Sequence, residues 1–174
     1  MSQTIPLIFW AFPIVFTIHN IEEALWLPRF SQSAGKFHKA VGTFEFVFAL
    51  VVITLLAAVI TLLFYLMGKE SIPCYLFFAF NFGMLVNVFF PHLAATVVLR
   101  RYCPGLLTGI FLLAPTTIYL LVYGYDNAYF SFPKFWIITI PFAGLVVGSI
   151  PLLFRIGRYL QKMIVKERTK PAAP

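Results

Sequence analysis

The sequence predicts an all-helical integral membrane protein, a single bundle of five transmembrane helices. Of its 174 residues, 61% are hydrophobic and 11% are charged, whereas a soluble domain carries about 25% charged residues. The apolar residues also fall into long runs, and one helix needs about 20 of them to cross a bilayer. These two observations exclude a soluble enzyme, a disordered chain and a secreted disulfide scaffold.

The first two apolar runs differ in how regular they are. The first, Ile5–Leu27, contains Pro6 and Pro13. The second, Val41–Met67, is unbroken except for Glu45. Because lipid offers the backbone no hydrogen-bond partners, both runs are expected to be helical.

The remaining three runs are Ile72–Leu99, Pro104–Tyr123 and Phe135–Leu160. The fourth run begins with proline, which is favoured at the first helical position. The connections are short, and no internal repeat or low-complexity linker separates the runs. We therefore expect residues 1–165 to form one five-helix transmembrane domain, followed by a polar C-terminal tail at residues 166–174.

Lysine and arginine are unevenly divided between the two ends of this predicted bundle. In a five-span arrangement eleven lie at one end, in Arg29–Ala40, in Arg100–Cys103 and from Arg155 onward. Only Lys69 and Lys134 lie at the other end. Since basic loops remain in the cytoplasm, we expect a bacterial inner-membrane protein with its N-terminus outside and its C-terminus in the cytoplasm. The net charge of +7 then has an explanation other than nucleic-acid binding.

Polar residues inside the runs gather at one predicted depth. They are His19, Asn20, Glu22 and Glu23 in the first run, Glu45 in the second, and Asn87 and His92 in the third. On a helix, Glu22 lies about 60° to one side of His19 and Glu23 about 40° to the other, so all three can share a face. Charges at mid-membrane cost at least about 2.5 kcal/mol each, which favours pairing or metal binding.

Two histidines with neighbouring carboxylates predict a divalent metal site. A His-x-x-Glu segment with a distant histidine is the ligand set of carboxypeptidase-type zinc sites, here His19, Glu22 and His92. Glu23 would then be the general base, although it fits equally well as the ligand. Glu45 is the other candidate for proton transfer. Zinc is the first choice of metal, and the same ligand set also suits Fe(II).

Each of these assignments has a structural alternative. Glu22 and Glu23 could be hydrated at the membrane interface, because only about 8 Å of helix separates them from Pro28. A histidine after a proline, as His92 follows Pro91, is often a hydrogen-bonded structural group.

Substrate contacts are expected from polar residues beside the cluster, namely Asn20, Asn87, Arg100 and Arg101. The two arginines are most simply orientation anchors, and alternatively they clamp a headgroup or phosphate. Membrane lipid, or a lipid-like small molecule, is the expected partner.

Small residues and cysteines add two weaker expectations. Gly144 and Gly148 have the spacing of a close helix contact, a candidate homodimer face. Cys74 and Cys103 fall at opposite ends of the third run, about 37 Å apart, which is too far for a disulfide.

Three motifs in order carry a family resemblance. They are His19-Asn20-Ile21-Glu22-Glu23, then His92, then Tyr102-Cys103-Pro104-Gly105. Over about residues 14–123 the chain resembles the HXXEE family of small bacterial membrane proteins. The resemblance implies a membrane enzyme of unspecified reaction. It marks Tyr102 as a further site residue, which we assign to substrate binding.

Together these inferences predict a membrane-embedded metal-dependent enzyme, a zinc hydrolase as first hypothesis, acting on a lipid-like substrate at the cytoplasmic leaflet. Two other classes of protein stay open. A metal-free His/Glu cluster could catalyse isomerisation or cyclisation of a lipid by acid–base chemistry. A proton-linked carrier or a lipid-binding protein would use the same buried groups without catalysis, although carriers commonly contain an inverted repeat.

Overall fold

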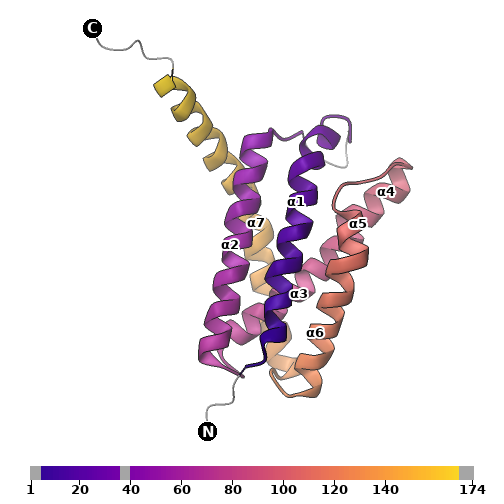
Figure 1. Cartoon of the computed structure of the whole chain (residues 1–174), viewed down its shortest axis with the longest axis vertical. Coiled ribbons are helices and arrows are strands. Elements are labelled where there is room, and N and C mark those ends of the chain that lie inside the picture. Colours follow the sequence, from indigo (N-terminus) through magenta and orange to yellow (C-terminus); the bar gives the residue numbers. More distant parts are fainter. Residues whose placement is uncertain (1–4, 36–39, 169–174) are drawn as a thin grey trace.

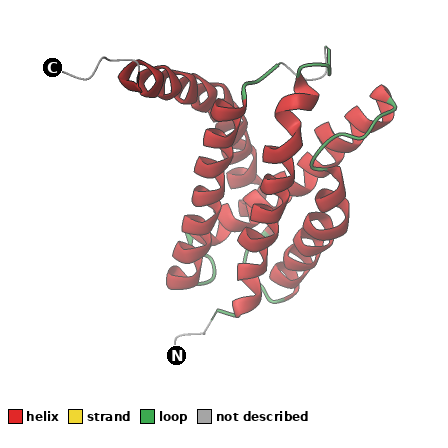
Figure 2. Cartoon of the chain, turned by 45° about the horizontal axis from the view of Figure 1, so that its top comes forward, coloured by secondary structure: helices red, strands yellow, loops and turns green. Residues whose placement is uncertain are grey.

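The computed structural model describes residues 5–35 and 40–168, and throughout these ranges the chain forms helices joined by short connections, with no strand (Figures 1 and 2). The elements in order are the 3₁₀-helix η1 (Leu7–Trp10), α1 (Ala11–Ser31), α2 (Thr43–Met67), α3 (Ile72–Asn87), the π-helix η2 (Val88–Leu93), α4 (Ala94–Leu99), α5 (Leu106–Thr108), the π-helix η3 (Gly109–Leu113), α6 (Ala114–Asp126) and α7 (Phe132–Arg168).

Four helical stretches within the described ranges are long and apolar enough to cross a membrane. They are Thr43–Met67, Ile72–Leu99, Leu106–Asp126 and Phe132–Lys166. Their outer faces carry large apolar side chains, such as Leu66 at 69% exposure and Ile137 at 72%. So much exposed apolar surface is typical of a lipid-facing protein and unfavourable in water. The predicted class, an all-helical membrane protein, is confirmed at this level.

Helix α1 is not one of these four, and it carries the polar His19-to-Glu23 segment. It lies in the middle of the bundle beside α2 and α6 (Figure 1). The helix also continues four residues beyond the predicted end at Leu27, through Pro28 to Ser31. The Ser31 hydroxyl donates a 2.7 Å hydrogen bond to the Pro28 carbonyl, which satisfies one acceptor in the last turn.

The third predicted run is not one continuous helix. Between α3 and α4 the backbone leaves the helical region at Phe90 (φ −139°, ψ 114°), and a cis peptide bond joins Phe90 to Pro91. Proline lacks the N–H that a helix interior requires, so the helix is interrupted in η2, between α3 and α4. His92 lies on η2, immediately after this break.

An aromatic core fills the end of the bundle where α1 begins. The ring of Phe9 lies 5.0 Å from the rings of both Phe64 and Tyr129, and 5.5 Å from that of Phe77. Edge-to-face contacts of this kind add about 0.5–1.5 kcal/mol each to the burial of the rings. Four segments distant in sequence are held together here, and the polar residues lie further along α1.

Helix α7 is longer at both ends than the predicted run. Its last turns extend beyond the rest of the bundle, at the end opposite to the start of α1 (Figure 1). Of the predicted polar tail, residues 166–168 continue this helix, and residues 169–174 lie outside the described ranges. Cys74 and Cys103 are both buried and not disulfide-bonded.

Candidate metal centre

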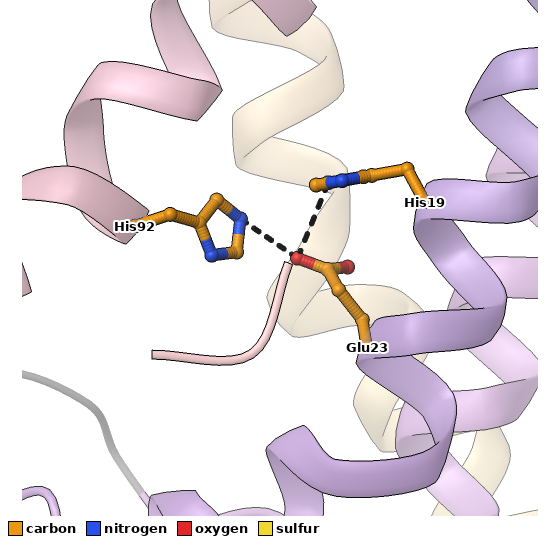
Figure 3. A group of neighbouring side chains, drawn as sticks. All are labelled: His19, Glu23 and His92. Atoms are coloured by element: carbon orange, nitrogen blue, oxygen red, sulfur yellow. Dashed lines mark ion pairs between the residues drawn. The ribbon is translucent and has the colours of Figure 1, made fainter. Parts of the chain in front are cut away.

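Three buried side chains converge in the interior of the bundle, His19 and Glu23 from α1 and His92 from η2 (Figure 3). Oε1 of Glu23 lies 2.8 Å from Nε2 of His92 and 3.6 Å from Nε2 of His19. The two imidazole rings are 5.3 Å apart and perpendicular. Within the described ranges, this is the group of three ligand-type residues close enough to share one metal ion.

Local structure explains why these three meet. His19 and Glu23 are four residues apart on a regular helix, so their side chains lie one above the other on one face. His92 lies on η2, two residues after the break at Phe90, and its side chain reaches Glu23 of α1. The prediction from helix geometry named His19 and both glutamates; the structure brings Glu23 to the histidines.

The hydrogen bonds of His19 fix its tautomer. The Thr108 hydroxyl donates its single proton to Glu22 Oε2 at 2.5 Å. In its 3.1 Å contact with His19 Nδ1, that hydroxyl must therefore accept, and Nδ1 must carry the proton. Nε2 is left with a lone pair directed toward Glu23, and it has no hydrogen-bond partner among the described residues. Metal-binding histidines are commonly oriented in this way, through the nitrogen that does not bind the metal.

His92 has a similar pair of neighbours. The Asn87 amide nitrogen donates to Nε2 over 3.1 Å, and the Cys103 sulfur lies 3.7 Å from Nδ1. The Asn87 amide nitrogen can only donate, which favours a lone pair on Nε2, whereas the Cys103 thiol can donate to Nδ1 or accept from it. Both Nε2 atoms face the same carboxylate oxygen, and the 2.8 Å contact between His92 and Glu23 requires a proton or a cation between these two atoms.

The distances fit a small metal ion after a slight adjustment. Two ligand atoms of a tetrahedral zinc site are about 3.4 Å apart, because each lies about 2.1 Å from the metal. The His19–Glu23 separation of 3.6 Å is close to this value. The 2.8 Å between His92 and Glu23 is a hydrogen-bond distance, so metal binding there would separate the two groups by about 0.6 Å.

Glu22 lies outside this group and binds the start of the next helical segment. Its Oε1 accepts from the Gly105 N–H at 2.7 Å, and its Oε2 accepts from the Thr108 N–H at 2.8 Å. The Tyr102 hydroxyl donates to the same carboxylate. A helix N-terminus has unpaired N–H groups and a partial positive charge, so a carboxylate is a favourable cap. Burial, together with the bond to Glu22, raises the pKa of Tyr102 to about 12.

Gly105 makes the close approach of this turn to the histidine possible. Its φ is +94°, a conformation that glycine adopts without strain. A Cβ at this position would lie 2.5 Å from His92 Cε1 and 3.1 Å from Glu23 Oε1. The glycine of the Tyr-x-Pro-Gly motif therefore allows the turn to pack against His92, because it has no side chain.

The other predicted site residues lie in three places: beside the centre, buried elsewhere in the bundle, and at the surface. Asn20, which donates to Thr54 Oγ1 at 2.7 Å, and Asn87 line the cavity described below. Glu45 is apart from the histidines, where it accepts hydrogen bonds from the Gly42 N–H and from Arg158 at 3.0 Å.

The two predicted headgroup arginines lie in the exposed connection after α4. Arg101 donates to Ser33 Oγ at 3.0 Å and stacks 4.5 Å over the Phe30 ring. Arg100 ends α4 in the left-handed conformation. The candidate dimer glycines, Gly144 and Gly148, face open space, since a Cβ on either would meet no atom within 4 Å.

A cavity of about 460 Å³ adjoins the centre, between α1, α2, α3 and α7. Glu23 and His92 form part of its wall, and most of the remaining lining is apolar. Ligand cavities typically measure about 300–1,000 Å³ and place a few polar groups on a hydrophobic wall. The centre is therefore accessible to an apolar molecule within the bundle.

Three residues of the centre were not assigned a role from sequence: Cys103, Gly105 and Thr108. The first two lie in the Tyr-x-Pro-Gly segment, and Thr108 follows three residues later. Their proximity to that motif was the available signal. It did not indicate that the turn folds back onto α1, because neither helix period nor hydropathy encodes that contact.

The fold and the centre define the class: an all-helical membrane protein with a buried His/Glu group at an apolar cavity. Residues 10–120 match the family described as a protein of unknown function with HXXEE motif, and the chain belongs to this family. It is similar to the uncharacterized protein YrkK of Bacillus subtilis (strain 168), with 40% identity over 149 residues, which cover 86% of this chain and 93% of that protein. No solved structure matches the chain.

Proposed function

We propose that this protein is a membrane-embedded metal-dependent enzyme that acts on a lipid-like substrate, with His19, Glu23 and His92 as ligands and zinc as the metal. The observation that carries the proposal is the convergence of the two Nε2 atoms on one carboxylate oxygen. A divalent cation would neutralise the carboxylate and occupy both lone pairs. The set of two histidines and one carboxylate is shared by catalytic zinc sites and by Fe(II) sites.

Hydrolysis is the reaction that this arrangement supports best. A bound zinc ion activates water at neutral pH and polarises a carbonyl group. The water oxygen would bond to the acyl carbon, and the bond from that carbon to the leaving oxygen or nitrogen would break. The water protons would pass to the leaving group and the medium, giving an acid and an alcohol or amine. Asn20 and Asn87 lie on the cavity wall, where they can orient the substrate.

We further propose that α1 is a fifth membrane span, with the N-terminus outside and the centre toward the cytoplasmic leaflet of the inner membrane. Support comes from the basic residues of the described ranges. Arg29, Arg101 and Arg158 lie near the end of the bundle where α1 terminates and α2 begins. Lys69 and Lys134 lie at the opposite end, which is the asymmetry that the positive-inside rule describes.

Metal analysis of the purified full-length protein tests the metal assignment. We expect about one equivalent of zinc or iron per chain, as a single site with these ligands requires. The metal should be lost in the His19→Ala, His92→Ala double variant and retained in His38→Ala, which removes the remaining histidine of the sequence. Wild-type protein without metal, or a double variant that keeps it, would contradict the proposal.

A metal-free enzyme is the second candidate, and the 2.8 Å contact between His92 and Glu23 favours it. That pair can transfer a proton without any metal, as an isomerase or a cyclase of a lipid requires. The two candidates differ in their response to chelation. Lipid turnover that survives exhaustive treatment with a chelator, with no metal remaining, would support the metal-free mechanism.

A further inference from the structure

The cavity beside the metal centre has one polar wall and is apolar elsewhere. The polar residues of the lining are Asn20 and Glu23 on α1, Asn87 at the end of α3, His92 on η2, and Cys103 in the turn after α4. Its other described lining residues are hydrocarbon, aromatic, thioether or glycine. A molecule that fills this space must therefore be apolar over most of its surface, with a polar group at one place.

The shape of the lining indicates a single hydrocarbon chain. On α7 the lining extends from Phe142 to Phe154, a distance of about 18 Å along the helix axis. On α1 it extends from Phe16 to Phe30, past the polar residues. The cavity is long in the direction of the helices, which suits one extended hydrocarbon chain, and its volume of about 460 Å³ lies within the range of ligand cavities.

The charges of the cavity lining indicate which polar group a bound lipid carries. None of the described lining residues is a lysine or arginine, the residues that commonly recognise a phosphate headgroup. The nearest helix N-terminus, which could also bind an anion, already binds the Glu22 carboxylate through Gly105 and Thr108. Asn20 and Asn87 instead offer amide groups, which match the carbonyl and N–H or O–H of a neutral ester or amide.

We propose that this cavity binds a neutral single-chain lipid, of the class of monoacyl esters and amides, with its carbonyl beside Asn20 and Asn87 and its chain along α7. The assignment rests on the proposed function in taking this lipid as the substrate. A lipid with a phosphate headgroup beyond its ester would bring a charge without a lysine or arginine partner into a mostly apolar cavity, which is unfavourable.

Two helical glycines provide a matched pair of variants. Gly83 lines the cavity and Gly144 does not. A Cβ at either glycine would meet nothing within 4 Å, and leucine is a better helix former than glycine by about 0.7–1 kcal/mol. Gly83→Leu therefore fills the cavity without touching the metal ligands, while Gly144→Leu makes the same chemical change elsewhere.

The experiment uses purified full-length protein and a photoactivatable monoacylglycerol as the probe. Unlabelled monooleoylglycerol should compete with crosslinking, and oleoyl lysophosphatidate should compete at least about tenfold more weakly. Gly83→Leu should weaken crosslinking by about tenfold or more, and Gly144→Leu should match wild type. Metal content, measured on the same samples, should be equal in all three proteins.

The outcomes separate this inference from the proposed function. Equal or stronger competition by lysophosphatidate would overturn the neutral class, and undiminished crosslinking in Gly83→Leu would overturn the cavity as the binding site. Metal without specific probe binding would overturn this inference and leave the metal centre standing. Specific probe binding without metal would support the lipid site and count against the metal-dependent mechanism.

Discussion

Adjacent glutamates on α1 have different partners, and this difference organises the centre. Glu23 lies between the two histidines, whereas Glu22 binds the N-terminus of α5. The Thr108 hydroxyl joins the two halves, because it donates to Glu22 and accepts from His19. Glu22 thereby helps to set the tautomer of a histidine that it does not touch.

The residue-scale prediction compares the two glutamates. Glu22→Ala removes the cap, and loss of hydrogen bonds to a charged acceptor should lower the free energy of unfolding by about 2 kcal/mol. Glu23→Ala removes a proposed metal ligand and should abolish metal binding. Thermal unfolding in detergent and metal content, measured on both variants, check the assignment. If Glu22→Ala lost the metal while Glu23→Ala kept it, the roles would be reversed.

Two turns hold the elements in place, and both depend on specific residues. At the end nearest the site, the Gly105 turn brings the start of α5 against His92. At the opposite end, Glu70 accepts hydrogen bonds from Tyr75 at 2.7 Å and from Lys134 at 3.3 Å. The helices thus gain part of their relative placement from their connections, in addition to side-chain packing.

Gly105→Ala tests the first turn. A side chain at positive φ is strained by about 1 kcal/mol or more, and here the new methyl group would also collide with the His92 ring. We expect a lower unfolding temperature and weaker metal binding than in wild type. Gly148→Ala is the control, since its Cβ meets no atom within 4 Å. A variant indistinguishable from wild type in both measurements would show that the turn does not contact the histidine.

The second turn predicts a pH dependence. The Tyr75 hydroxyl and Lys134 hold the pKa of Glu70 below its ordinary value of 4.5. The ionised Glu70 carboxylate therefore stabilises the folded state fully above pH 4.5. This stabilisation is lost as the pH falls through the lower pKa that Glu70 has in the folded state. Wild type and Glu70→Gln should differ slightly in unfolding temperature at pH 7 and converge at low pH. The effect is small because the carboxylate is half-exposed, and a difference that grew on acidification would contradict it.

At the scale of the whole molecule, the bundle has two distinct ends. The end where α1 begins is an aromatic core around Phe9, Phe64 and Tyr129. The polar centre and its cavity lie further along α1, toward the end that carries most of the basic residues. Rigid packing at one end leaves room between the helices toward the other, where a lipid could bind.

Topology is the prediction at this scale. A phosphatase that is active only outside the cytoplasm should be inactive when fused after α7 and active when fused after Lys69, because five spans place these sites on opposite sides. A fluorescent protein that folds in the cytoplasm should give the complementary pattern. Four spans without α1 would place the N-terminus in the cytoplasm as well, so a third fusion at the N-terminus decides between the two counts.

The sequence by itself determined the helical membrane class, the approximate bounds of the apolar runs and the polar residues that lie inside them. These features depend on composition and on the length of apolar segments, which can be counted along the chain. It also placed His19 and Glu23 on one face, because helix geometry is local.

Only the tertiary structure decided which groups meet. His92, just after the break at Phe90, meets Glu23 of α1, and the Gly105 turn supplies the donors that separate Glu22 from Glu23. Glu45 lies apart because Arg158, more than a hundred residues later, pairs with it. Such contacts join positions far apart in the chain, and their energies depend on three-dimensional distance, which no periodicity in the sequence encodes.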